Sequence, residues 1–244
     1  MPLFNPLLLL VAPLSNLFFS TWSAQAQSKQ RWSFGPRVGI NYSTLVGYPA
    51  GSLPDLFKRS YLAGVSAGVG TIYSDMSRFG IGIDVLYSQR GYRYSTADAD
   101  PPTVAGKNRI HYVEVPVTAR YFLNRSGSFR PAIFAGPVFS ARLRAHDKTV
   151  FLGQTELDGY NTSDFRPAEL GATAGFQLNF RVADRQRITI DGRYTYGIST
   201  VTTYDARTFA NGTHNQFFTL GLGYNFGIGR EYQPGDRKLP VQTR

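Results

Sequence analysis

The stretch YVEVPVTARYF (residues 112–122) alternates between two kinds of side chain at every second position. Val113 and Val115 stand on one face, and Glu114 and Arg120 stand on the other. Alternation with a period of two predicts a β-strand with two different faces. In a soluble β-protein the valines would pack in a core. In an outer-membrane barrel they would contact lipid, and the two charges would point into the lumen.

The composition excludes several classes of function. The chain has 244 residues with 15 Tyr, 18 Phe and 25 Gly, which is rich in tyrosine and glycine for a cytosolic enzyme. It has no cysteine, so disulfides, thiolate catalysis and cysteine metal sites are excluded. The net charge is +10, but the basic residues are scattered singly and form no dense run. We therefore expect no nucleic-acid partner and no cofactor.

The N-terminal residues predict export. The apolar run PLLLLVAPLSNLFF is followed by the small-x-small site Ala24-Gln25-Ala26, so residues 1–26 are interpreted as a signal peptide. The alternative is a hydrophobic N-terminal helix that is retained. Residues 27–229 are expected to form one barrel domain, and residues 230–244 a polar C-terminal tail. No later segment reaches ~18 consecutive apolar residues, so we expect no transmembrane helix in the mature chain.

Eight segments show this alternation, and most are longer than the ~5–6 residues of a usual strand. Tight polar turns follow the second, fourth and sixth segments, whereas long connections (45–60, 92–108, 145–165 and 200–214) follow the others. This pattern is typical of an all-β, eight-stranded antiparallel up-and-down transmembrane β-barrel. The segments are Ser33–Thr44, Tyr61–Tyr73, Arg78–Gly91, Arg109–Leu123, Ser128–Arg144, Arg166–Arg181, Gln186–Ser199 and Asn215–Ile228.

Glycines indicate which face points inward. They share a face with the charged residues. On a solvent-exposed strand face, glycine weakens the strand and contributes no compensating contact. In the narrow lumen of an eight-stranded barrel, glycine makes room for a neighbouring long side chain. We therefore expect the polar face inside, with arginine–carboxylate pairs whose partners the sequence does not specify. The expected luminal charge network comprises Arg37, Asp84, Arg90, Glu114, Arg120, Arg142, Glu169, Asp191 and Arg193, with Arg181 as a further base.

Seven motifs occur in an order that resembles the PorT-like outer-membrane β-barrel family of Bacteroidetes-type bacteria. The most specific is Tyr112-Val113-Glu114-Val115-Pro116, and the resemblance covers about Trp32 to Gly229. It implies an outer-membrane location, both termini in the periplasm and long loops outside. The founding member is associated with protein secretion across that membrane. The chain departs from many such barrels because it continues past the last aromatic strand residue, Phe226. The motifs are VGINYST, VLYSQRGYRY, IHYVEVPVTARYF, RPAIFAGPVFSARL, LGATAGFQLNF, DGRYTYGIST and FFTLGLGYNFG.

Two features are weighed against simpler explanations. Pro116 lacks a ladder donor, so we expect a bulge there, or a carbonyl satisfied by a side chain or water. The histidines His111, His146 and His214 lie near the expected outer rim. However, no nucleophile elbow, metal-spaced histidine pair or phosphate loop accompanies them. No catalytic or metal site is assigned.

The sequence thus favours a non-enzymatic outer-membrane protein with a structural or interaction role, accessory to secretion or envelope organisation. Its expected partners are outer-membrane lipid and proteins that bind the long extracellular loops. Three alternatives stay open. They are a narrow, porin-like pore for small solutes, a hydrolase or acyltransferase at the rim, and a soluble ligand-binding barrel with its faces reversed.

Heat-modifiability distinguishes the membrane barrel from the soluble one. We expect the protein, extracted from membranes in mild detergent, to run faster in SDS gels before boiling than after it, because a closed barrel resists SDS. Recovery in the soluble periplasmic fraction with no such shift would reverse the assignment of the two faces.

Overall fold

The computed structural model describes residues 32–47, 57–74, 78–96, 102–124, 127–151, 156–183, 185–203 and 212–228. The expected signal peptide and the expected polar tail lie outside these residues. No helix in the described ranges is long and apolar enough to span a membrane. The elements are β1 (Trp32–Val46), β2 (Phe57–Ser74), β3 (Phe79–Thr96), β4 (Val104–Phe122), β5 (Phe129–Phe151), β6 (Leu157–Tyr160), the 3-10 helix η3 (Thr162–Asp164), β7 (Ala168–Ala183), β8 (Gln186–Gly197) and β9 (His214–Ile228).

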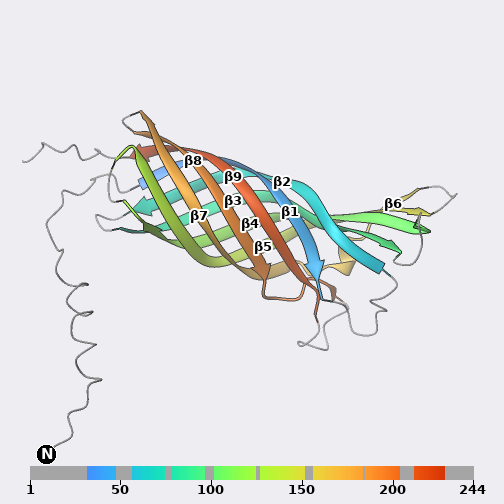
Figure 1. The fold of residues 1–244 in the computed structure, drawn as a ribbon. Coiled ribbons are helices and arrows are strands. Elements are labelled where there is room, and N and C mark those ends of the chain that lie inside the picture. The colour runs from blue at the N-terminus through green and yellow to red at the C-terminus, as the bar shows by residue number, and fades with distance from the viewer. Residues whose placement is uncertain are drawn as a thin grey trace, which may run out of the picture.

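The strands form one nine-stranded sheet in the order β4-β3-β2-β1-β9-β8-β7-β5-β6. An additional pairing between β4 and β5 joins the ends, so that all strands except β6 make a closed ring of eight. Every neighbouring pair is antiparallel. Figure 1 shows the resulting barrel with strongly tilted strands. This confirms the eight-stranded up-and-down barrel predicted from the sequence.

The two ends of the barrel differ. At one end, short connections across residues 75–78, 123–128 and 184–185 join consecutive strands. Trp32 at the start of β1 and Ile228 at the end of β9 lie opposite each other at this same end. Short turns and both barrel termini mark the periplasmic end of an outer-membrane barrel. The opposite end, with the longer connections, is therefore the outer end (Figure 1).

The apolar face of each strand points outward. Val38 and Leu220 are 54% and 62% exposed, whereas Arg37 and Asp84 are 4% and 2% exposed. A water-soluble barrel would show the reverse distribution, because burial of charge and exposure of valine both cost free energy in water. The valines of the opening stretch therefore lie on the outer wall, as the membrane-barrel interpretation predicts.

Two bands of aromatic pairs border the apolar wall, as interfacial girdles do in membrane barrels. Trp32 and Tyr42 are ten residues apart on β1, which corresponds to ~34 Å along the strand and ~26 Å along the barrel axis at a tilt of ~40°. That height matches the apolar band of an outer-membrane barrel. The periplasmic pairs are Trp32–Tyr73, Phe79–Tyr121 and Phe129–Phe180, and the outer pairs are Tyr42–Tyr61 and Tyr194–Phe218, with ring centroids 4.7–5.2 Å apart.

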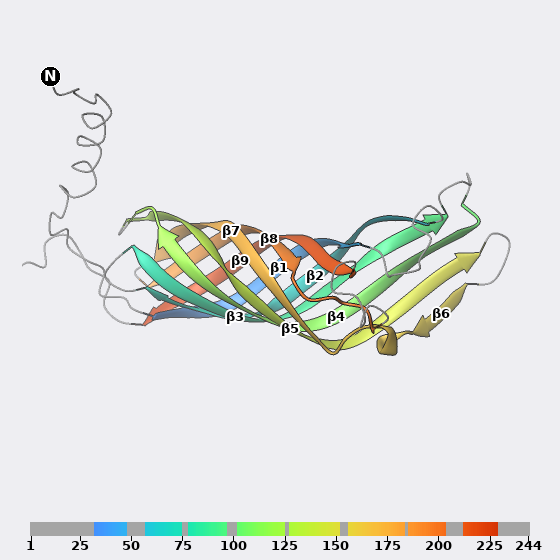
Figure 2. The ribbon, with the colours of Figure 1, turned by 90° about the horizontal axis from the view of Figure 1, so that it is seen from below.

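Part of the connections expected to be loops is strand. β3 continues to Thr96, β4 begins at Val104, and β5 continues to Phe151, where it pairs with β6. Figure 2 shows these strands projecting from the outer end of the barrel. The sequence did not predict these strand extensions, because both faces of the projecting sheet lie outside the apolar band. Hydrogen-bond pairing continues there, but the alternation of apolar and polar residues ends.

The bulge expected at Pro116 is absent. Pro116 lies opposite Val138 in a continuous β4–β5 register, although the β3–β4 ladder lacks pairs between Val117 and Glu114. A proline removes one donor but adds no residue, so it weakens the ladder locally without shifting it. The register shift lies instead between His111 and Tyr112, at the outer end of the barrel.

We expect Val115→Arg to lower the free energy of unfolding by about 2–4 kcal/mol, because it places a charge on the lipid-facing wall near the bilayer midplane. Val150→Arg is the matched control, since Val150 is exposed on the projecting part of β5. It should change stability by less than about 0.5 kcal/mol. Urea unfolding in lipid vesicles measures both, and equal effects would contradict the assigned membrane boundary.

Candidate functional site

Polar side chains fill the lumen and gather at three levels. We call Arg37, Asp84, Asp191 and Arg193 the middle cluster, and Arg90, Glu114 and Glu169 the outer cluster. A third level, nearer the periplasm, is formed by Arg120 and Gln177. These side chains come from five of the eight ring strands, and pairs such as Arg193–Asp84 and Arg90–Glu169 join strands that are not neighbours in the sheet.

The middle cluster contains two arginines and two aspartates that contact one another alternately. Arg193 Nη2 lies 2.8 Å from Asp191 Oδ2, and Arg193 Nη1 lies 3.7 Å from Asp84 Oδ2. Arg37 Nε lies 3.7 Å from Asp84 Oδ1, and Arg37 Nη1 lies 3.8 Å from Asp191 Oδ1. The formal charges of the four groups cancel, which compensates much of the cost of burying them.

The outer cluster is centred on Arg90. Its Nη2 lies 2.5 Å from Glu114 Oε1 and its Nε donates to the same oxygen at 2.8 Å, while Nη1 lies 3.5 Å from Glu169 Oε2. Asn215 Nδ2 donates to Glu169 at 2.7 Å. The guanidinium also lies over the Phe217 ring, 4.0 Å from its centroid. Burial among aromatic rings strengthens these contacts because little water screens them.

The remaining expected bases bind other partners. Arg120 donates to Gln177 Oε1 and lies near the Phe134 ring. Arg142 does not join a carboxylate within the described residues, because at its level the lumen is apolar. It donates to the backbone carbonyl of Phe165 at 2.5 Å, so its assignment to the charge network was wrong. Arg181 is exposed at the periplasmic rim, outside the lumen.

Luminal glycines make the space that these side chains occupy. A Cβ atom on Gly70 would overlap Asp84 Oδ1, and one on Gly82 would overlap Arg120 Nε. A Cβ on Gly221 would lie 2.7 Å from Asp191 Oδ1. The ion pairs and the glycines therefore depend on each other, because the narrow lumen has no room for these charged side chains if the neighbouring strand carries a side chain at the glycine position.

An apolar cluster closes the outer end above the charges. Leu45, Ile110, Phe165 and Val201 are buried against one another together with Tyr112. Phe165 is held by an isolated bridge to Thr202. Sequence reasoning missed this cluster, since Phe165 and Val201 belong to connections. Ile110 gave a usable signal, because it is an apolar residue at a luminal position.

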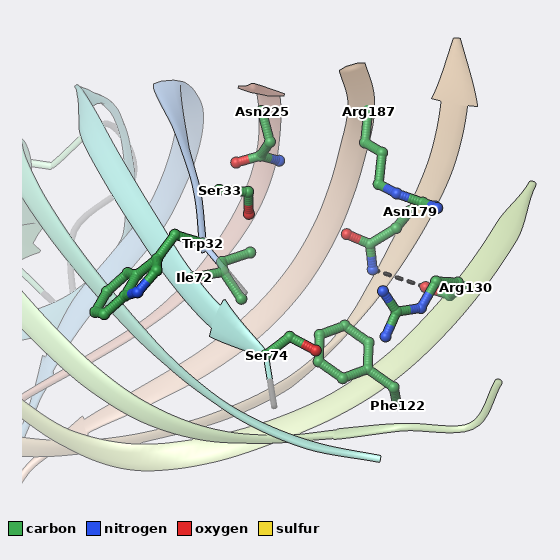
Figure 3. A pocket seen from close by; sticks show the side chains of 9 residues that line it. All are labelled: Trp32, Ser33, Ile72, Ser74, Phe122, Arg130, Asn179, Arg187 and Asn225. Atoms are coloured by element: carbon green, nitrogen blue, oxygen red, sulfur yellow. Dashed lines mark hydrogen bonds between the residues drawn. The ribbon is translucent and has the colours of Figure 1, made fainter. Parts of the chain in front are cut away.

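Two small cavities lie among the described residues of the lumen. The one at the periplasmic end has a volume of about 30 Å³ (Figure 3). A second, of about 10 Å³, lies beside Glu114 and Arg193. Spaces of this size hold one or two waters and no organic solute. The first cavity is lined by Trp32, Ser33, Ile72, Ser74, Phe122, Arg130, Asn179, Arg187 and Asn225.

The three histidines do not assemble a reactive site. His146 Nε2 lies 2.5 Å from Asp158 Oδ1 at the exposed β6, and His214 Nδ1 lies 3.0 Å from a backbone carbonyl oxygen. His111 contacts the Tyr87 hydroxyl. Over the described ranges, no group of three or more His, Cys, Asp or Glu side chains could hold a metal ion.

Comparisons with known proteins agree with this architecture. A family model described as "Outer membrane protein beta-barrel domain" matches residues 24–203. No curated protein sequence is significantly similar to the chain. OprG, an outer membrane protein of Pseudomonas aeruginosa, is similar in fold, with a TM-score of 0.53, 10% identity, and coverage of 84% of this chain and 98% of that one. At this identity the likeness concerns the fold alone.

Two further solved structures are similar at lower scores. Neisserial surface protein A gives a TM-score of 0.43 at 14% identity, covering 81% of this chain and 97% of that one. The outer membrane protease OmpT of Escherichia coli gives 0.43 at 8% identity, covering 84% and 99%.

We expect Glu114→Ala to reduce the free energy of unfolding by about 3–5 kcal/mol, because it leaves Arg90 buried without its nearest carboxylate. Glu156→Ala is the control, since Glu156 forms an exposed ion pair with Lys148. Its cost should be below about 1 kcal/mol. Urea unfolding of both variants in the same vesicles tests this, and a nearly silent Glu114 substitution would show that the luminal pair is unimportant for stability.

Gly70→Ala should destabilise the barrel by about 1–3 kcal/mol, because the added methyl group overpacks the space held by Asp84. Gly159→Ala serves as its control, since a Cβ at Gly159 meets nothing within 4 Å. The temperature at which the unboiled gel band disappears reports both effects. If the two variants lose the band at the same temperature, the absence of a side chain at the luminal glycines is not needed for packing of the lumen.

Proposed function

This chain belongs to the outer membrane protein β-barrel domain family, and on that premise we propose that it is a closed, non-enzymatic barrel with a structural or interaction role. The protein lies in the outer membrane, in contact with lipid. Its function then depends on which part of the barrel is available to other molecules.

The packed lumen is the observation that carries the proposal. Both charge clusters are paired across the lumen, and the apolar cluster of Leu45, Ile110, Phe165 and Val201 lies above them. The cavity beside Glu114 and Arg193 and the cavity at the periplasmic end have room for only one or two waters each. A solute path would require several buried ion pairs to break together, at several kcal/mol for each pair.

The projecting sheet is the part that we assign to interaction. Binding residues commonly lie on extensions of a rigid scaffold. Here β6 offers four consecutive exposed residues at an open sheet edge. We further propose that the chain is PorT-like and accessory to protein secretion or envelope organisation. The motif Tyr112–Pro116 supports this role through its resemblance to that family.

Planar-bilayer recording tests the closed lumen. We expect the folded wild-type protein to give no stepwise conductance, with a known porin inserted in the same bilayer as the positive control. Reproducible steps that disappear in Glu114→Gln would overturn the proposal in favour of a narrow pore.

Complementation tests the interaction role. In a strain that lacks the chain and shows a secretion or envelope defect, the wild-type gene should restore the phenotype. A variant in which residues 92–108 are replaced by a tight turn should not, although its heat-modified gel shift is retained. Full rescue by that variant would show that the function does not require the projecting sheet.

A further inference from the structure

Basic residues of β3, β4 and β5 share one face of the projecting sheet. Arg93 on β3 lies directly opposite Lys107 on β4. Arg109 lies opposite His146 on β5, and Arg144 lies opposite His111. Residues directly opposite each other in an antiparallel pair project from the same side of the sheet. We call Arg93, Lys107, Arg109 and Arg144 the outer cationic face.

This face continues the lipid-facing wall. Along β4, Val113, His111, Arg109 and Lys107 follow at intervals of two residues, so all four point to the same side. The wall residue Tyr87, which lies opposite Val113, contacts His111 Nδ1 through its hydroxyl at 2.5 Å. The basic residues are thus not on the luminal side of the projection.

Their height corresponds to lipid headgroups. Arg109 and Lys107 lie ~14 and ~20 Å beyond Val113 along the strand, at ~3.4 Å per residue. With a strand tilt of ~40° they stand ~10 and ~15 Å above Val113 along the barrel axis. Measured from Tyr121 in the periplasmic aromatic band, Arg109 and Lys107 therefore lie ~5 and ~10 Å beyond the outer boundary of the ~26 Å apolar wall. Both residues belong to β4, whose extension beyond the barrel is seen in Figure 2 beside those of β3 and β5.

The charges of this face are not balanced within the sheet. In the described part of the chain, none of the four residues has an ion pair. The nearby bases Lys148 and His146 do have partners, Glu156 and Asp158, at the β6 edge.

The opposite side of the sheet holds its own acid. There, Asp147 accepts hydrogen bonds from Tyr94 and Asn108. Like charges placed directly opposite each other, as in Arg93 and Lys107, destabilise a strand pair. An external anion bound between the two side chains would offset this charge repulsion.

We propose that the outer cationic face binds the phosphate groups of a phosphorylated lipid in the outer leaflet. Arginine binds phosphate oxygens through two parallel N–H donors, and lysine adds a point charge. A lipid is the occupant because the face adjoins the acyl-chain surface without a break: one molecule contacts Val113 and Phe139 with its chains while its phosphates contact the arginines above. This proposal rests on the outer-membrane location and is independent of the closed lumen.

The proposed lipid site is tested by binding titrations of the full chain in mild detergent, with diphosphoryl lipid A as the probe. Arg109→Gln/Arg144→Gln and Arg93→Gln/Lys107→Gln should each weaken binding by about tenfold or more, the loss expected for one charge-assisted contact. The control is Arg78→Gln/Arg185→Gln, which removes the same charge at the periplasmic rim and should change the affinity less than about twofold. Unchanged heat-modifiability verifies that each variant is folded.

The chemistry of the probe distinguishes the sources of the anion. Lipid A without its phosphates should bind at least about tenfold more weakly to the wild type, and added NaCl should weaken the phosphorylated lipid further. Equal affinity for both lipids would overturn the proposal. So would equal losses in the control variant, or displacement of the lipid by free inorganic phosphate at equal concentration. Binding of heparin but not of the lipid would assign the face to a soluble polyanion instead.

Discussion

Backbone N–H and C=O groups in the hydrocarbon layer have no water to bind, so they must be satisfied within the protein wall. In this chain the pairing of β4 with β5 meets that requirement, because it joins the two ends of the sheet into a ring. The unbroken register at Pro116 shows how strictly the requirement holds. The strand accepts the loss of a donor rather than shift its whole alternating pattern by one position.

Closing the ring at eight strands has a consequence for the interior. The lumen is about as wide as the side chains that fill it, so luminal residues must be chosen for volume as well as for charge. Arg37 reaches Asp84 and Asp191 only because Gly70 and Gly223 stand where its guanidinium group lies. The same packing that pairs the charges fills the described part of the lumen, which connects the stability of the barrel with its proposed lack of conductance.

Outside the membrane the requirement is relaxed, and the structure changes accordingly. β2, β3, β4 and β5 continue as an open sheet that has the short, exposed β6 at one edge. Water can satisfy that edge, so no ring is needed. Some side chains there, such as Lys148, pair with an acid of the same sheet, whereas Arg93 and Arg109 have no ion pair among the described residues. The apolar wall turns into the outer cationic face within a few residues of β4, and this transition joins a membrane anchor to a surface suited to anionic partners.

From the sequence alone, the strand count, the identity of the two faces and the alternation of short and long connections could be determined. These depend on local geometry, because side chains alternate along any strand and turn residues act over a few positions. The positions of Asp84, Glu114, Glu169 and Asp191 on the luminal face followed from the same alternation. Their partners did not follow, because pairs across a barrel depend on strand tilt and stagger, which involve the whole ring.

The tertiary structure alone decided the remaining features. It placed Arg142 against a backbone carbonyl, since an apolar cluster contributed by distant connections occupies its level. It extended β2, β3, β4 and β5 beyond the membrane, where the alternation of residue types that identifies a strand in the sequence is lost. It also aligned Arg93, Lys107, Arg109 and Arg144 on one face, because only the register of three strands brings residues so far apart in the chain together.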